Sequence, residues 1–459
     1  MRVNLNILNI SLWLILLGVF FLPFNSWEGI SFLGEYYRDS CILFFLASFF
    51  LIIFKKKIKL PLHSSIFYLI IIFVSWALIS TLLNSQSLVE YSFKQTTGII
   101  RFSRQYISLI IASLILPITF YNCFIHFDVN EIALKIRKVI FYSLMIVFIY
   151  AIIETLIIKF NFIFLKKSLL NLFDYFPFVE AKTDLRLKRI SSVTFEPPAL
   201  GTYLITIFSW MASYILTSKN KLRFAPALIV IILAFLSGSR AAFFIIIFQA
   251  IIFVVIISRS SKYNRIFIKI LVSFSIIFSF LLVTSAPKII NYVSNEIKSF
   301  KLDDKDHSLS NKSRFGIQYA MYKVFLENPV IGTGYGLQAF ESKSKYPAWA
   351  KSNNWEFRLK YLNPKNKRFP PGYNLYLRLA TETGIIGLSI FLLIIIQTLI
   401  WSYNTIKSKN SLMGIIVGIS LIGFVLNWLK MDTFRIYGFW ICLTLIFFTS
   451  LNKRISNEK

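Results

Sequence analysis

The most regular feature of this sequence is a series of long apolar segments separated by shorter polar ones. A helix needs about 20 predominantly apolar residues to cross the hydrocarbon core of a bilayer. About twelve segments fit, although the second and seventh are short for a full span, and they lie near residues 7–24, 40–54, 61–83, 105–122, 139–158, 198–217, 224–238, 240–258, 266–285, 376–401, 412–429 and 434–451. The pattern predicts an all-α polytopic membrane protein with about twelve transmembrane helices.

The composition supports a membrane protein. Hydrophobic residues make up 56% of the chain and charged residues only 15%, whereas a soluble domain carries roughly 25% charged residues. The formal net charge of +29 would suggest nucleic-acid binding in a soluble protein. Here many basic residues lie between apolar segments, where they set topology and contact anionic headgroups. We therefore expect membrane lipids as partners and no nucleic acid.

The basic residues also predict an orientation, because short loops rich in Lys and Arg remain in the cytoplasm. When Arg2 is placed inside, every connection that falls inside is basic, down to Lys453 and Arg454 at the end of the chain. The first outside connection is mainly acidic, with Glu28, Glu35 and Asp39 against Arg38. Both termini are therefore expected to be cytoplasmic.

Two outside loops, residues 159–197 and 287–375, are too long to be simple connectors. The second contains a stretch with aromatic residues at helical spacing, Ser313–Asn328, which Ser313 would cap and Pro329 would end. We expect a folded cap that rests on the membrane. The chain then divides into helices 1–9 (1–286), the large loop between helices 9 and 10 (287–375), and helices 10–12 with a cytoplasmic tail (376–459).

The charge of the large outer loop points to its ligand. Residues 287–375 contain 15 Lys and Arg against 7 Asp and Glu. Long loops need not follow the rule for short ones, but a surplus of positive charge outside needs a reason. A large anionic ligand on the outer face would supply one.

No metal centre is expected, because potential ligands are scattered. The three cysteines and three histidines are widely separated, at Cys41, Cys123, Cys442, His63, His126 and His307. The sequence therefore predicts neither a metal site nor another cofactor.

Two groups of residues near the outer face could carry chemistry. Arg189 precedes a segment in which Glu196 and Pro197 begin the sixth helix. Proline and an acidic residue are also ordinary at a helix start, so Glu196 is either structural or a base or binder of sugar hydroxyls. Arg240 lies in a Gly-Ser-Arg turn between two apolar segments. Such an arginine often marks only an interfacial turn, but its planar fork suits phosphate oxygens.

Two further groups lie in and after the large loop. Arg314 would open the loop helix, so that its guanidinium and the helix N-terminus face one anion. Three glycines that follow resemble a nucleotide loop only weakly, because no strand-loop-helix unit surrounds them. The fourth group is Tyr373, Asn374, Arg378 and Glu382. We expect Glu382 to hydrogen-bond neighbouring helices rather than to perform chemistry.

These motifs together resemble the O-antigen polymerase and ligase superfamily. The shared pattern is a Gly-Ser-Arg turn, an Arg-led helix, Asn-Pro-x-x-Gly-x-Gly-x-Gly, and Asn and Leu followed by Glu-x-Gly-x-x-Gly. In this chain they are SGSRAAF (237–243), SRFGIQYAMYKVF (313–325), NPVIGTGYG (328–336) and YNLYLRLATETGIIGL (373–388). The resemblance covers chiefly residues 189–390 and implies a GT-C-like membrane fold.

The resemblance implies a metal-independent glycosyltransferase in the bacterial inner membrane that uses an undecaprenyl-diphosphate-linked donor on the outer face. Arg240 and Arg314 match the arginines that ligases place at the diphosphate, and Glu196 is our candidate base. We further expect Arg189, Tyr335, Tyr373, Asn374 and Arg378 to bind substrate, and Glu382 and Gly384 to be structural.

One departure favours a polymerase of lipopolysaccharide or capsule repeat units over a ligase. Ligases usually have His-Asn where this chain has Tyr373 and Asn374. A polymerase could work with a chain-length regulator and a flippase. A ligase that transfers glycan to lipid A core or protein remains an alternative, as does a transporter of such lipids.

Overall fold

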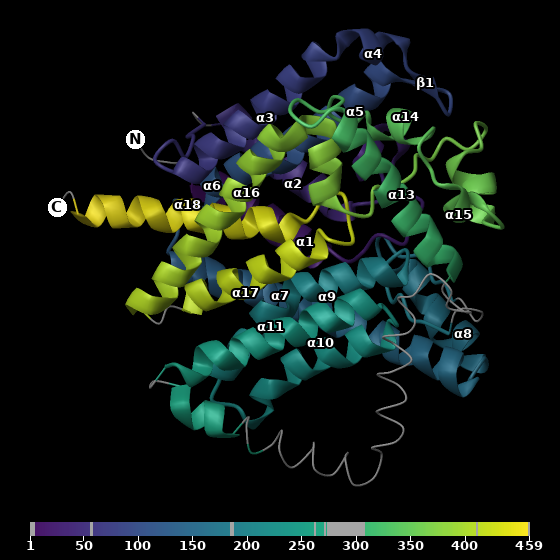
Figure 1. The fold of residues 1–459 in the computed structure, drawn as a ribbon. Coiled ribbons are helices and arrows are strands. Elements are labelled where there is room, and N and C mark those ends of the chain that lie inside the picture. The colour runs from purple at the N-terminus through teal and green to yellow at the C-terminus, as the bar shows by residue number, and fades with distance from the viewer. Residues whose placement is uncertain are drawn as a thin grey trace.

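The computed structural model describes residues 5–55, 58–183, 188–260, 263–269, 272, 308–409 and 412–457. Most of these residues are helical, which confirms an all-α architecture (Figure 1). The longer helices of the first part are α1 (Leu5–Phe20), α2 (Ser40–Lys55), α3 (Ser65–Leu83), α5 (Gly98–Ile110), α6 (Leu116–Phe124), α7 (Val129–Phe160), α9 (Pro197–Thr217), α10 (Ala225–Leu236) and α11 (Arg240–Ser258). Those of the second part are α13 (Ser308–Glu327), α16 (Leu375–Lys409), α17 (Leu412–Asn427) and α18 (Tyr437–Asn457).

Six of the described helical segments are long and apolar enough to cross a membrane: 65–83, 98–124, 129–160, 197–217, 240–258 and 375–407. The second of them is α5 and α6 joined through a π-helical turn, Ile111–Ile115. Four shorter apolar helices accompany them, at the described parts of α1, α2, α17 and α18. The predicted segment at 266–285 lies mostly outside the described residues, so the count of twelve spans stays a prediction.

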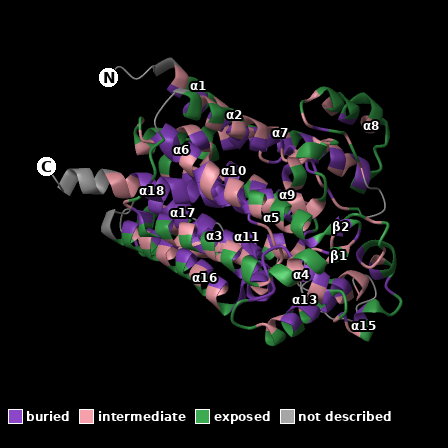
Figure 2. Cartoon of the chain, turned by 90° about the horizontal axis from the view of Figure 1, so that it is seen from above, coloured by how far each residue is buried: buried purple, intermediate pink, exposed green. Residues whose placement is uncertain are grey.

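The helices form one bundle with a cap at one end. The cap elements α13, α14 (Gln338–Ser342) and α15 (Ala348–Lys351) lie at the opposite end from the free end of α18 (Figure 1). Buried residues concentrate where the helices pack, and exposed ones lie on the outer helix faces and the loops (Figure 2). Helix α9 is enclosed by α10, α11 and α17, and Trp210 on it is almost fully buried.

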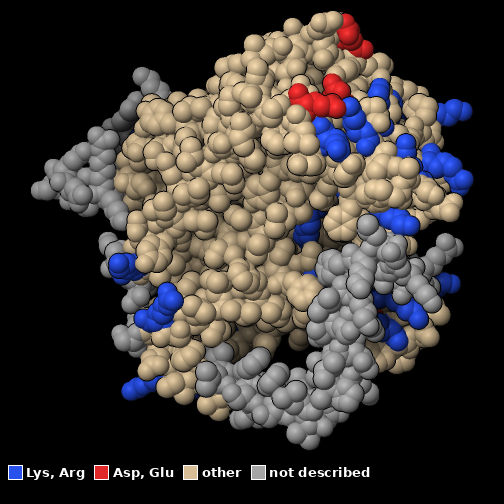
Figure 3. All heavy atoms as spheres, viewed as in Figure 1, with Lys and Arg blue, Asp and Glu red and all other residues tan. Residues whose placement is uncertain are grey.

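Charged side chains follow the same division. On the face shown in Figure 3, they gather at the two ends of the bundle and leave a largely uncharged band between them. The end that carries the cap shows many Lys and Arg and few acidic residues in this view. An uncharged band across parallel helices is what a protein that spans a bilayer needs, and the cap lies outside that band.

The cap has a small apolar core of its own. Its members come from α13, from α15 and the residues just before it, and from a π-helical turn, Glu356–Tyr361; they are Ile317, Ala320, Met321, Tyr346, Ala350, Phe357 and Tyr361. Gly316 lets α13 approach α15 closely, because a Cβ there would lie 2.3 Å from the Cβ of Ala350. The described part of the large loop is therefore folded rather than extended.

A two-stranded hairpin, β1 (Ser92–Phe93) and β2 (Thr96–Thr97), holds one side of the cap. Lys94 and Gln95 form its turn with φ of +54° and +59°, the left-handed conformation that two-residue hairpins favour. The buried Lys94 Nζ donates hydrogen bonds to the carbonyl oxygens of Lys360, Asn363 (3.3 Å) and Asn366 (2.9 Å). This lysine fixes the segment after the cap core.

Helix α16 is interrupted at Gly384, whose φ is +66°. The glycine-rich segment 328–336 packs into the interruption: Gly334 N donates to Glu382 O (2.9 Å) and Ile385 N donates to Pro329 O (2.8 Å). Glycine is required, since a Cβ on Gly384 would lie 2.0 Å from Val330 O. The glycine motif therefore supports a broken helix, which agrees with a structural role for Gly384.

Candidate functional site

Glu196 lies at the junction between an irregular segment and α9. Its backbone is extended, Pro197 follows at the first helical position, and its carboxylate makes no capping hydrogen bond to a described residue. The carbonyl oxygen of Glu196 instead accepts from Ala199 N (3.0 Å). The side chain is exposed and remains available for a ligand.

Glu154 fixes the segment that leads to Glu196. This buried carboxylate of α7 accepts hydrogen bonds from the backbone of Ser191 (3.1 Å) and Ser192 (2.7 Å). Two backbone donors on one carboxylate hold both residues in place. Sequence reasoning missed Glu154, and its only signal is an acidic residue within an apolar segment.

Glu196 is surrounded by positive charge. Burial by the surrounding protein raises the pKa of its carboxyl group, while four cations act in the opposite direction: Arg314, Arg189, Lys360 and Arg368. Three of the four come from the large outer loop, and two of these, Lys360 and Arg368, were not among the predicted site residues. With Lys430 they form what we call the Glu196 cluster.

Arg314 stands in the cluster on α13, but not where the sequence predicted. The helix includes Ser308, so Arg314 lies more than one turn inside it and does not open it. The prediction that the guanidinium and the helix N-terminus face one anion together was therefore wrong. Ser313 is no cap either, since it is buried and its hydroxyl accepts from Asn354 Nδ2 (2.9 Å).

An aromatic ring positions the exposed side chain of Arg314. The guanidinium carbon lies 5.3 Å from the centre of the Tyr373 ring. The hydroxyl groups of Tyr373 and Tyr361 are 2.8 Å apart and hydrogen-bonded. Burial raises the pKa of the Tyr373 hydroxyl, so this group is a weaker acid than an ordinary tyrosine and is poorly suited to act as a base near neutral pH.

Arg189 joins the cluster to the Gly-Ser-Arg turn. Its Nε donates to Ser237 O (3.0 Å) and lies 2.9 Å from where a Cβ on Gly238 would stand. Gly238 has φ of +59°, so glycine serves both the turn and the arginine. Arg240 begins α11 two residues later, partly exposed, and makes a polar or electrostatic contact within the protein.

Lys430 is a third residue of the cluster that sequence reasoning missed, after Lys360 and Arg368. It lies in the connection between α17 and α18, and its Nζ is shielded from solvent with no hydrogen-bond partner among the described residues. Burial lowers the pKa of Lys430 to about 7, helped by the charge of Arg314 and opposed by that of Glu196. The signal available in the sequence was one lysine in a short connection between two apolar segments.

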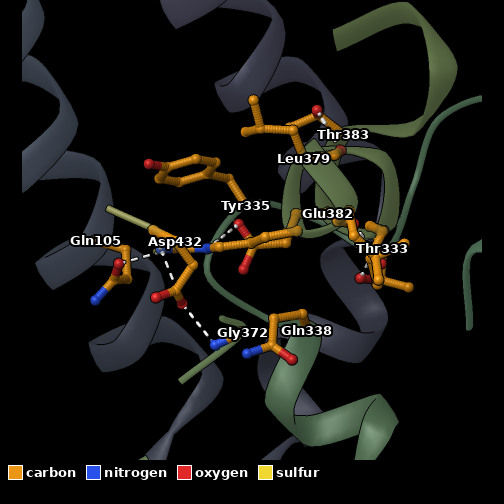
Figure 4. Close-up of polar contacts among 12 residues, drawn as sticks. Gln105, Thr333, Tyr335, Gln338, Gly372, Leu379, Glu382, Thr383 and Asp432 are labelled. Carbon is orange, nitrogen blue, oxygen red and sulfur yellow. Dashed lines mark hydrogen bonds and ion pairs between the residues drawn. The ribbon is translucent and has the colours of Figure 1, made fainter. Parts of the chain in front are cut away.

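Arg378 belongs to a second polar group, and only 6% of it is exposed. Its guanidinium donates to Glu382 Oε2 (3.1 Å), Asp432 O (2.7 Å) and Gln105 Oε1 (2.8 Å), so three sides are occupied. Figure 4 labels these three acceptor residues. The Tyr335 ring lies 5.5 Å from its guanidinium carbon. We call this group the Arg378 network.

The network extends through α5 to the connection between α1 and α2. Glu35 accepts from Gln105 Nε2 (2.6 Å) and from Arg101 (3.0 Å). Glu382 therefore pairs with an arginine of its own helix, rather than with neighbouring helices as expected. That Tyr335 and Arg378 contact substrate stays a prediction, and the observed contacts give them a supporting position.

Asn374 caps α16. Its Oδ1 accepts from Leu377 N (3.1 Å) and its carbonyl oxygen accepts from Arg378 N (3.0 Å). Both bonds are typical of an N-cap residue. The neighbouring Gly372 N donates to Asp432 Oδ2 (2.7 Å). Asp432 thus ties the Arg378 network to the segment that presents Tyr373 to Arg314.

The described residues include no group of three or more His, Cys, Asp or Glu that could hold a metal ion. Comparison with known families gives one match: residues 225–392 fit the family model described as O-antigen ligase. No curated protein matches the chain. The matched region contains Arg240, Arg314 and Tyr373, whereas Arg189, Glu196 and Lys430 lie outside it.

Proposed function

We propose that this chain, whose residues 225–392 fit the O-antigen ligase family model, is a member of the O-antigen polymerase and ligase superfamily and polymerises lipid-diphosphate-linked oligosaccharides on the outer face of the bacterial cytoplasmic membrane. The observation that carries the proposal is the Glu196 cluster, in which cations from four separate segments surround one carboxylate. Five cations around one carboxylate leave a surplus of positive charge that an anion would balance, and a diphosphate supplies one.

The proposed reaction needs little covalent help from the protein. The acceptor hydroxyl attacks the anomeric carbon of the donor sugar, the bond from that carbon to the diphosphate oxygen breaks, and the hydroxyl proton passes to a base. Negative charge develops on the leaving diphosphate, where Arg314, Arg189 and Arg240 would stabilise it. Orientation of the two substrates supplies most of the remaining rate.

Glu196 is the proposed base. Its carboxylate is not used for capping and stands among the cations that would hold the donor. Because burial raises the pKa of this carboxyl group, it accepts a proton more readily than an ordinary glutamate. Tyr373, at the position where ligases carry histidine, instead packs its ring beside Arg314 and serves as a positioning residue.

The choice of polymerase over ligase rests on Tyr373, and a strain that lacks this protein tests it. Without a polymerase, cells should carry single repeat units on their usual acceptor. Without a ligase, they should accumulate long polymer on the lipid carrier. The second outcome would make this chain a ligase, in line with the description of the matched family.

A transporter is the rival of another class, since transporters use broken helices to bind ions or substrates. Helix α16 is broken at Gly384, but protein groups occupy the freed carbonyls. Ser80 Oγ donates to Glu382 O (3.1 Å) and Trp76 Nε1 donates to Thr383 O (2.8 Å). The break is thereby filled, which favours the enzyme.

The direct test uses purified protein in lipid nanodiscs and a synthetic lipid-diphosphate-linked repeat unit. We expect a ladder of products that differ by one repeat, formed equally well with excess EDTA, because arginine rather than a divalent ion would meet the diphosphate charge. A single product on a lipid A core acceptor would indicate a ligase. Release of the unchanged lipid to the opposite leaflet would indicate a transporter.

A further inference from the structure

Lys430 is held at a position where a free ammonium group is unfavourable. A buried polar group normally has a hydrogen-bond partner, and a buried cation without one is more unfavourable than an unpartnered neutral polar group. Lys430 Nζ has no hydrogen-bond partner among the described residues and is shielded from solvent. A position of this kind suggests that the partner is a ligand.

The backbone around Lys430 is rigidly held. Lys430 N donates to Asn427 O (3.0 Å) at the end of α17. Trp428 Nε1 donates to Thr433 O (3.0 Å), and Leu375 N at the start of α16 donates to Trp428 O (2.9 Å). The connection from α17 to α18 is thus closed on itself and anchored to α16, so Lys430 does not owe its position to a mobile loop.

The charges that face Lys430 come from two other elements. Arg314 of α13 repels the ammonium group, and Glu196 at the start of α9 attracts it. Arg189, Lys360 and Arg368 also interact electrostatically with Glu196. The ring of Tyr373 lies beside Arg314. In the connection between α17 and α18, the acidic residue nearest to Lys430 in sequence is Asp432. Its Oδ2 accepts a hydrogen bond from Gly372 N (2.7 Å) and lies 4.0 Å from Arg378 Nη1.

We propose that Lys430 is a binding residue for the anionic diphosphate of the donor, and that it takes up a proton as the diphosphate binds between it and Arg314. This inference rests on the proposed function and adds a residue outside the family match. A dianionic ligand would supply the missing hydrogen-bond acceptors and restore the charged form of the amine. One proton enters from solvent for each neutral lysine that becomes charged.

The proposal predicts a pH dependence of donor affinity. With a pKa of about 7 in the free protein, Lys430 is charged below that pH and neutral above it. Binding above it must include proton uptake, so affinity should fall by up to about tenfold per pH unit. Below it the affinity should level off.

The probe is a farnesyl diphosphate ester of N-acetylglucosamine, in nanodiscs of zwitterionic lipid. Both of its phosphates are esterified, so that neither has the second ionisation near pH 6 that a terminal phosphate shows. We expect wild-type affinity to decrease from about pH 7 towards pH 9. Lys430→Arg should bind with a flat profile over this range, because arginine stays charged, and Lys430→Met should bind weakly throughout.

A stability measurement separates a ligand-binding lysine from a structural one. Removal of an unpartnered buried amine should raise the melting temperature, so Lys430→Met should be more stable than wild type while binding the probe less well. Lys345→Met is the matched control, since Lys345 is paired with Glu327 on the same cap. It should leave both the probe affinity and its pH profile unchanged.

The outcomes distinguish the two proposals. If the wild type does not bind the probe at any pH, the proposed function fails together with this inference. If it binds with a flat profile, or if Lys430→Met binds as well as wild type, only the role of Lys430 is overturned. A lower melting temperature with unchanged affinity in Lys430→Met would make Lys430 structural.

Discussion

The Glu196 cluster and the Arg378 network are both rich in charge, yet they are built differently. In the Arg378 network, a buried guanidinium has a protein acceptor on three sides, and Glu35, Glu382 and Asp432 accompany the arginines. In the Glu196 cluster, cations outnumber carboxylates, Arg314 is exposed and Lys430 Nζ has no hydrogen-bond partner among the described residues. Glu382 Oε1 and Arg101 Nε of the network also have no partner among the described residues, but the Arg378 guanidinium has its acceptors within the protein, whereas Lys430 Nζ has no acceptor among those residues.

This difference separates residues that hold the site from residues that would act in it. Buried ion pairs add little net stability, but removal of one partner is costly, so the Arg378 network is a device for fixing positions. Asp432 shows what it fixes: the carboxylate binds Gly372 N beside Tyr373, and the residue follows Lys430 by two. The network thereby positions two parts of the Glu196 cluster.

The largest effect is expected from Arg378→Ala. The substitution leaves Glu382, Gln105 and Asp432 O without their donor in a buried place, at a cost of about 3–5 kcal/mol. The variant should fail to accumulate or should aggregate, as measured by fluorescence-detected size-exclusion chromatography. Normal amounts of active Arg378→Ala protein would remove the distinction between the two regions.

Arg314→Ala should lower activity strongly without loss of stability, unlike Arg378→Ala. The side chain is exposed and lies over the ring of Tyr373, so protein level and melting temperature should stay close to wild type. Polymer formation should fall by about 10²-fold or more, as when a donor to a developing oxyanion is lost, and Arg314→Lys should rescue poorly. Exposed Arg358 on the same cap gives the matched control, Arg358→Ala, which should remain active.

The sequence predicted the fold class and the helices well, because long apolar segments dictate helices in a bilayer. It failed where tertiary contacts decide. The start of α13 was placed at Ser313, since a serine before an aromatic pattern looks like a cap, but Ser313 is buried against Asn354. The hairpin at Lys94 has no Asn-Gly signal, and the interruption of α16 depends on a segment about 50 residues away.

For the site, the sequence motifs pointed to some residues of the Glu196 cluster but not to those that complete its surroundings. Arg314 and Glu196 were identified, and the structure brings them together. Arg378 carried the same chemical signal as Arg314, and only its burial separates the two. Glu154 and Lys430 lie outside the motifs, and their roles follow from backbone donors and from a missing partner, neither of which a sequence displays.

Glu196→Gln should lower polymer formation by about 10²-fold with little effect on donor binding or stability. The base must be deprotonated, and burial raises its pKa. As the pH falls, wild-type activity should therefore be lost at a higher pH than an ordinary glutamate would give. The pH profile of kcat measures this. Glu327→Gln, at an exposed pair with Lys345, is the control, and equal losses in both variants would exclude Glu196 as the base.

The smallest effect is expected from Tyr373→Phe. The substitution removes one hydroxyl and leaves the Tyr361 hydroxyl, 2.8 Å away, without that partner, which costs about 1 kcal/mol. The ring beside Arg314 remains, so activity should fall only about fivefold. Tyr373→Ala removes the ring as well and should cost more, chiefly by releasing Arg314, since a guanidinium over an aromatic face is worth about 0.5–2 kcal/mol. If Tyr373→Phe were as inactive as Glu196→Gln, the hydroxyl itself would take part in the reaction. Tyr373 would then belong with the acting residues of the Glu196 cluster rather than with the residues that position them.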